Sequence, residues 1–183
     1  MTNVVARYGG VAIALHWASA VLVVAGFALG LWMTGLDLSP ATLRYYAWHK
    51  WIGVTVFLLA IARLLWRLRH PAPPPAAGLP AWQHVASVAT HHLLYVLILA
   101  VPLSGWLMSS AKGLQTVYFG ILPLPDLLDK NKELGDLLLQ VHQVLNFTLG
   151  ALVITHLTAA LKHHFIDRDE VLGRMIPFLD RKK

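Results

Sequence analysis

Four long hydrophobic runs, separated by shorter polar or proline-rich segments, dominate the pattern of the chain. They cover about residues 11–36, 45–66, 82–108 and 137–161. An α-helix needs about 20 mainly apolar residues to cross the hydrocarbon core of a bilayer, and each run reaches that length. The pattern predicts an all-α protein, a four-helix transmembrane bundle in which residues 1–183 form a single integral-membrane domain.

Two connections between these runs have distinct compositions. Residues 67–80 contain a cluster of prolines, which predicts a stiff, extended linker. Residues 112–136 form a longer loop with apolar patches, which we expect either at the membrane interface or, over 113–128, as a docking surface for a protein partner.

The composition excludes several classes of protein. Of the 183 residues, 57% are hydrophobic and only 13% are charged, whereas soluble domains carry about 25% charged residues. An ordinary soluble enzyme is therefore excluded. The chain has no cysteine, so thiolate zinc sites, iron–sulfur clusters and covalently attached c-type haem are excluded as well.

Positive charge is concentrated on the side of the predicted bundle that holds the two chain ends. Cytoplasmic segments of membrane proteins are enriched in Lys and Arg, so we expect both termini in the cytoplasm. The basic tail suits lipid headgroups as its partner, and nucleic acid is not expected. Ten cations lie on this side and five on the other: Arg7, Arg63, Arg67, Arg69, Lys162, Arg168, Arg174, Arg181, Lys182 and Lys183, against Arg44, Lys50, Lys112, Lys130 and Lys132.

Four of the ten histidines fall at two depths within the predicted spans. His49 and His142 lie near the outer ends of their helices, whereas His16 and His156 lie toward the inner side. The fourteen residues from His142 to His156 make almost four helical turns, so these two share a face about 21 Å apart. Polar groups at membrane depth are costly and usually functional.

Two histidines on facing helices at one depth match the axial ligands of a haem. Neutral imidazoles bind iron well, and a pair of them leaves no open position, so the expected cofactor is two haem b for single-electron transfer. Zinc fits less well without carboxylate or Cys ligands. Arg63 follows His49 by fourteen residues and Arg67 follows Arg63 by four, so both are candidate partners for haem propionates, or markers of the cytoplasmic side.

Two further histidines have more than one interpretation. His91 is a candidate inner haem ligand in place of His16 or His156, or a hydrogen-bonding partner for a quinone headgroup. His163, two turns beyond His156, is either an interfacial residue or part of that quinone site, since imidazole can both donate a hydrogen bond and carry a proton near neutral pH.

Several short motifs together resemble the bacterial cytochrome b561 family over almost the whole length of the chain. They are Ala14-Leu15-His16-Trp17, His49 with Arg63-Leu64-Leu65-Trp66-Arg67 and Pro71, His91-His92-Leu93-Leu94-Tyr95 with Pro102 and Gly105, His142, His156, and Ala159-Ala160-Leu161-Lys162-His163-His164. The resemblance implies a dihaem membrane cytochrome of the bacterial inner membrane, in which His16 pairs with His156 and His49 pairs with His142.

Within that family the chain is most similar to the small stand-alone superoxide oxidases. The resemblance implies electron transfer from superoxide, on the periplasmic side, to ubiquinone at a site near the inner haem, where His163 and His91 match family positions. Two alternatives remain open at this point. One is a membrane anchor and electron-relay subunit for a periplasmic dehydrogenase or hydrogenase, and the other is a structural membrane protein without haem.

Overall fold

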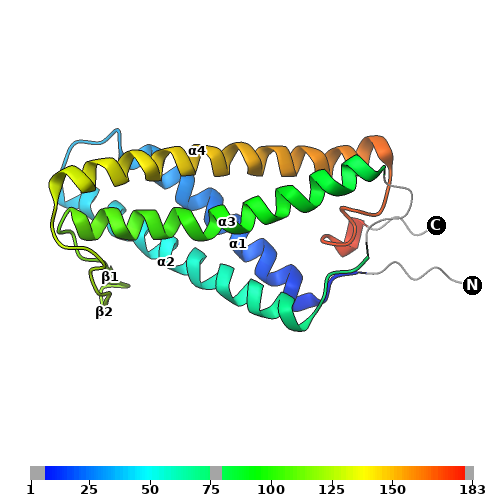
Figure 1. Cartoon of the computed structure of the whole chain (residues 1–183), viewed down its shortest axis with the longest axis horizontal. Helices are drawn as coiled ribbons and strands as arrows, with labels where there is room; N and C mark the ends of the chain where they lie inside the picture. Colours follow the sequence, from blue (N-terminus) through cyan, green and yellow to red (C-terminus); the bar gives the residue numbers. More distant parts are fainter. Residues whose placement is uncertain (1–6, 75–79, 180–183) are drawn as a thin grey trace, which may run out of the picture.

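The computed structural model describes residues 7–74 and 80–179, and this part of the chain contains four long helices (Figure 1). They are α1 (Gly10–Met33), α2 (Pro40–Arg69), α3 (Ala81–Ala111) and α4 (Lys132–Lys162). All four are long and apolar enough to cross a membrane. The predicted four-helix transmembrane fold is confirmed.

The second, third and fourth helices run past the spans expected from hydrophobicity, because capping groups and helix-forming residues continue beyond the apolar runs. Ser39 caps α2 by accepting a hydrogen bond from the Thr42 amide at 3.1 Å, and Pro40 occupies the first turn. Asn131 caps α4 by accepting from the Leu134 amide at 3.0 Å. At its other end α2 includes residues 67–69, which were wrongly expected in the extended linker.

The connections also differ in detail from the expectation. Pro102 lies inside α3, which continues to Ala111. The loop 112–136 contains a short antiparallel hairpin, β1 (Val117–Tyr118) and β2 (Leu122–Pro123), and its last residues already belong to α4. Residues 75–79 of the linker and the basic residues 181–183 lie outside the described residues.

The helices pack as two pairs. The most extensive packing is of α3 on α4 and of α1 on α2, and α2 against α3 joins the pairs. Buried apolar side chains form a core near mid-length: Val56, Ala60, Leu94, Leu97, Ile98, Val101 and Leu149. Large apolar side chains on the outer faces remain exposed, such as Val21, Leu58 and Ile154, as expected for surfaces that face lipid.

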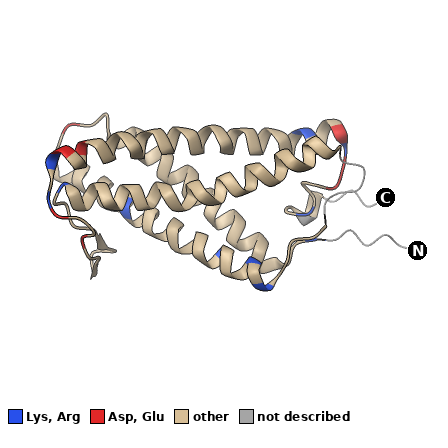
Figure 2. Cartoon of the chain, viewed as in Figure 1, with Lys and Arg blue, Asp and Glu red and all other residues tan. Residues whose placement is uncertain are grey.

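The bundle has two distinct ends. The hairpin lies at one of them, which we call the hairpin end (Figure 1). The first and last described residues lie at the other, the terminal end, together with η1 (His163–Asp167), a π-helical turn, and η2 (Pro177–Leu179), a 3₁₀ turn. The charged parts of the ribbon lie mostly toward these two ends (Figure 2).

Candidate functional site

At the hairpin end, two of the predicted histidines meet between the helix pairs. His49 on α2 and His142 on α4 have ring centres 6.2 Å apart, with the ring planes perpendicular. The Nδ1 atom of His49 is buried and has no hydrogen-bond partner. An unpaired buried polar atom is costly in an apolar interior, so this nitrogen marks a place where a further group is expected.

The other ring of this pair is fixed from α3. The Nδ1–H of His142 donates to the Ser104 hydroxyl oxygen at 2.9 Å and to the Val101 carbonyl at 3.1 Å, while the Ser104 hydroxyl itself donates to Val101 at 2.7 Å. With the proton on Nδ1, the lone pair of Nε2 is free to bind a metal. A hydrogen bond of this kind also fixes the orientation of a ligating imidazole.

Two glycines give these imidazoles their room. A Cβ atom on Gly30 would come within 3.1 Å of His49 Cε1, and one on Gly105 within 3.0 Å of His142 Cε1. An apolar cavity with lining residues from all four helices adjoins the two rings, and Gly26, Gly53 and Pro102 contribute to its wall. Small residues therefore line the space around both histidines.

Toward the terminal end, three histidines gather. His16 on α1 and His156 on α4 have ring centres 6.3 Å apart, and His91 on α3 lies 5.2 Å from His156. The guanidinium of Arg63 donates to His16 Nδ1 at 3.2 Å. His91 donates its Nδ1–H to the Ser87 carbonyl at 2.7 Å, which leaves its Nε2 unprotonated.

The two predicted arginines share an aromatic neighbour at this level. The guanidinium carbons of Arg63 and Arg67 lie 5.3 and 5.9 Å from the ring centre of Tyr95, within the range of a cation–π interaction. Through these contacts Tyr95 keeps the two guanidinium groups close to the three histidines.

The two histidine groups lie at different depths, with apolar core between them. The fourteen residues from His142 to His156 on the continuous helix α4 correspond to about 21 Å along its axis. Leu149, midway between them, is buried in the core.

His163 lies beyond the terminal-end group. It is the first residue of η1, and its seven-residue distance from His156 corresponds to about 10 Å along the helix axis. Its Nδ1 donates to an Asp169 carboxylate oxygen at 2.6 Å and lies 3.3 Å from Asp167, which also pairs with Lys162. The structure therefore ties His163 to the C-terminal segment.

Several side chains that contact the predicted residues were missed by reading the sequence alone. Ser104, Gly30 and Tyr95 lie far along the chain from the histidines or arginines that they touch, and Asp169 lies six residues beyond His163. Tyr95 and Gly105 carried a signal, as part of the family resemblance, but the contacts of Tyr95 with the two arginines and of Gly105 with His142 were not foreseen. A helical-wheel comparison of facing helices would have suggested such neighbours without choosing between them.

Comparison with known proteins identifies the family. The model of a family described as prokaryotic cytochrome b561 matches residues 7–178. The chain belongs to the prokaryotic cytochrome b561 family. Its relatives include cytochrome b561 homolog 2 of Escherichia coli, 37% identical over 183 residues, with 96% of this chain and 94% of the relative covered.

Two other proteins are also similar over nearly their full lengths. A probable superoxide oxidase CybB of Yersinia pestis is 28% identical over 179 residues, with 93% of this chain and 96% of that protein covered. Cytochrome b561 homolog 1 of Escherichia coli is 30% identical over 175 residues, with 93% of this chain and 97% of that protein covered. Family membership implies a multi-pass membrane protein that binds b-type haem and transfers electrons.

The residues at both depths fit such a group. An imidazole nitrogen binds a transition metal at about 2 Å, and this nitrogen lies roughly 1 Å from the ring centre, so two imidazoles opposed across one metal place their ring centres about 6 Å apart. The separations of 6.2 and 6.3 Å agree with this value. The contact of 5.2 Å between His91 and His156 is shorter than opposed ligation requires.

Proposed function

We propose that this cytochrome b561 binds two b haems and carries electrons across the bacterial inner membrane from superoxide, on the periplasmic side, to ubiquinone. The observation that carries the proposal is the presence of two histidine pairs, each with ring centres just over 6 Å apart, at opposite depths of the bundle. His49 and His142 are the proposed ligands at the hairpin end, and His16 and His156 those at the terminal end.

The chain's own residues set what each pair can do. Each haem, when bound, supplies an iron that gains or loses one electron. Two imidazoles from separate helices would hold the group on each level, and ligation by both would disfavour oxygen binding. The hydrogen bonds from His142 to Ser104 and Val101 keep its Nε2 lone pair directed away from α3. The apolar core around Leu149 separates the two pairs.

Arg63 is proposed to hold a propionate at the terminal end. Binding of iron through His16 Nε2 requires the proton on Nδ1, which then cannot accept the hydrogen bond that Arg63 donates. Arg63 would then be free to pair with a carboxylate beside Tyr95 and Arg67, where two guanidiniums suit an anion.

We predict that Arg63→Leu lowers the reduction potential of one haem by on the order of 50 mV. This corresponds to about a tenfold change in the equilibrium constant for its one-electron reduction. Removal of a nearby positive charge favours the ferric state, whereas Arg63→Lys keeps the charge and should shift the potential less. A spectroscopic redox titration of the purified protein measures both. Equal potentials in wild type and Arg63→Leu would rule out this role.

Gly105 provides a second prediction, at the hairpin end. In Gly105→Ala the added methyl group pushes against His142 Cε1, so we expect haem affinity at this pair to fall by about tenfold, a size typical of changes beside a metal ligand. Gly10→Ala is the matched control, since nothing lies within 4 Å of its added Cβ. The measurement is haem content after extensive dilution, and equal retention by the two variants would contradict the prediction.

Ubiquinone is proposed to react at the terminal end, where the His91 ring lies beside His156 and His163 lies two turns beyond it. Ubiquinone takes up two electrons and two protons, so its site needs proton-carrying groups with access to the cytoplasm. His163 can donate from Nε2 when protonated, and Asp169 holds its Nδ1–H. His91, with its Nδ1 bonded to Ser87, presents an accepting nitrogen to the same region.

The hairpin end is proposed to face the periplasm. Most of the cations of the chain flank the terminal end, and the basic residues 181–183, outside the described residues, follow it in sequence. By the positive-inside rule, this charge favours a cytoplasmic location for that end. At the hairpin end, superoxide is the proposed donor, supported by the similarity to the probable superoxide oxidase CybB. Each superoxide anion that gives up an electron leaves as molecular oxygen.

A stopped-flow measurement tests this function. Superoxide mixed with the oxidised protein should produce the spectrum of reduced b haem, and ubiquinone added in a second mixing step should restore the oxidised spectrum. If superoxide does not reduce the protein, but a periplasmic dehydrogenase or hydrogenase does, the relay-subunit alternative is correct and the superoxide proposal fails.

A further inference from the structure

The hairpin carries an exposed apolar surface that electron transfer does not use. Phe119, Ile121 and Leu122, which we call the hairpin patch, are 56%, 85% and 56% exposed. No charged residue occurs from 113 to 125. Large apolar side chains concentrated on one uncharged segment mark a site of contact with lipid or with another protein.

The patch is held in a defined shape. The strands pair Val117 with Pro123 and Tyr118 with Leu122, and the connecting turn uses left-handed conformations at Phe119 (φ 50°) and Gly120 (φ 73°). Glycine adopts this conformation without steric cost, whereas Phe does not. The turn therefore presents the Phe119 and Ile121 side chains at a fixed tip.

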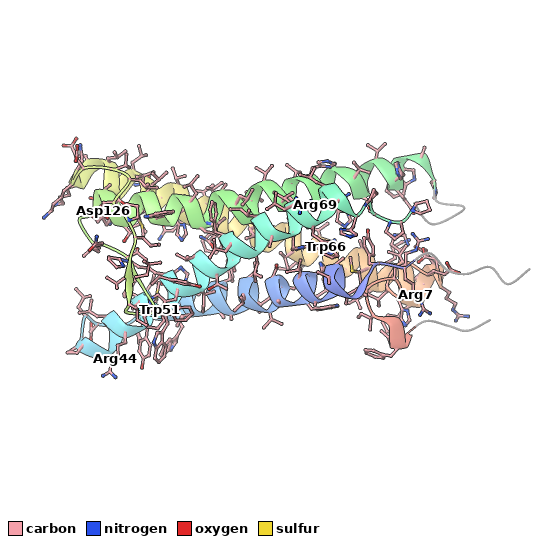
Figure 3. The ribbon with its side chains drawn as sticks, turned by 90° about the horizontal axis from the view of Figure 1, so that it is seen from below. Arg7, Arg44, Trp51, Trp66, Arg69 and Asp126 are labelled. Carbon is pink, nitrogen blue, oxygen red and sulfur yellow. The ribbon has the colours of Figure 1, made fainter. Side chains whose placement is uncertain are left out.

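Helix α2 anchors this hairpin through its side chains. The Trp51 indole N–H donates to the Val117 carbonyl at 2.7 Å, Lys50 Nζ donates to the Leu114 carbonyl at 2.8 Å, and the hydroxyls of Thr55 and Tyr118 lie 2.9 Å apart. The Trp51 and Phe119 rings are 5.3 Å apart. Figure 3 shows the hairpin segment running from the Asp126 side toward Trp51.

These anchors define the depth of the hairpin along the membrane span. Lys50 is the last charged residue before the uncharged stretch 51–62 of α2, so Trp51 lies at the edge of the hydrocarbon region. Thr55 is one turn further in, about 6 Å deeper. Trp and Tyr favour this interfacial level in membrane proteins, and here Trp51 and Tyr118 occupy it together.

We infer that the hairpin 117–123 is a lipid-binding element that inserts the hairpin patch into the membrane interface beside α2. The occupant is lipid because the hairpin is bonded to Trp51 and Thr55 of a membrane-crossing helix, at the edge of its uncharged stretch and one turn further in. A water-soluble partner would meet only surfaces that project beyond this level. The flanking charged residues Lys112, Asp126 and Lys130 lie outside the uncharged segment and mark where the chain returns to water.

Spin labelling tests the inference, since a chain without native cysteine accepts a label at one chosen position. Ile121→Cys places the label on the patch, and Asp129→Cys is the matched control, an exposed charged site on the same loop. Each haem-loaded, labelled protein is placed in nanodiscs of phosphatidylethanolamine and phosphatidylglycerol. Collision rates are then measured with oxygen, which concentrates in the bilayer, and with a water-soluble nickel chelate.

We expect the ratio of oxygen to nickel accessibility to be several-fold higher at position 121 than at position 129. Equal ratios would place the hairpin in water and overturn the inference. Protection of position 121 from both reagents would also overturn it, because the patch would then be covered by protein, either a second copy of this chain or a partner. Unchanged visible spectra of both labelled proteins show that the fold is retained.

Discussion

Replacement of His142 by alanine should remove about half of the bound haem. The change deletes one proposed axial ligand of the hairpin-end pair and leaves a cavity beside Ser104. His49→Ala should remove the same haem, because the centres of the two rings are 6.2 Å apart. A pyridine haemochrome assay on purified protein gives haem per chain, and the spectrum of the remaining haem should be identical in the two variants.

His84→Ala serves as the control, since this exposed histidine on α3 belongs to neither pair. His16→Ala and His156→Ala should each leave the haem that His142→Ala removes. Loss of the terminal-end haem in His91→Ala, together with its retention in His16→Ala, would show that His91 and not His16 is the ligand. Full haem content in both His142→Ala and His49→Ala would contradict the proposed hairpin-end pair.

Replacement of His163 should slow the reoxidation of reduced protein by ubiquinone by roughly 100-fold, the usual effect of losing a proton-transfer group. His163→Ala should leave both haem spectra intact, because the residue lies two turns beyond His156. Rapid mixing of pre-reduced protein with a soluble ubiquinone analogue measures the rate. Unchanged kinetics would remove His163 from the proposed site and make His91 the next residue to test.

Two comparisons make this result specific. His164→Ala changes the neighbouring histidine and should keep the wild-type rate. Asp169→Asn keeps the shape of the side chain that accepts from His163 Nδ1 but removes its charge, so the rate should fall less than in His163→Ala and its dependence on pH should change. A purely structural role for Asp169 would lower the amount of folded protein without altering that pH dependence.

The fold was predictable because it depends on length and apolar character alone. Runs of more than twenty mainly apolar residues have few alternatives to transmembrane helices, and the described part of the structure contains one long helix for each run. The ends were less predictable, because caps such as Ser39 and Asn131 extend helices into polar sequence that hydropathy does not distinguish from a loop. The hairpin 117–123 was missed because its strands have only two residues each.

The candidate site was predictable where helical periodicity determines depth. Counting turns places His142 and His156 on one face, and the same counting assigns His49 and His16 to the two levels. Counting turns does not give the rotation of each helix about its own axis. That rotation decides whether His91 or His16 faces His156. For that reason the three histidines of the terminal-end group, and the contacts of Ser104, Tyr95 and Asp169, became visible only in three dimensions.

Each chain is proposed to hold two haems, one at each histidine pair, and the haem-to-polypeptide ratio measures this number. Because the chain has no cysteine to tether a haem, both should be extracted by acidic organic solvent. The pyridine haemochrome assay, with protein quantified by amino-acid analysis, should give a ratio near two for protein purified with excess haem. A ratio that stays at one under those conditions, or a product that resists extraction, would contradict the account.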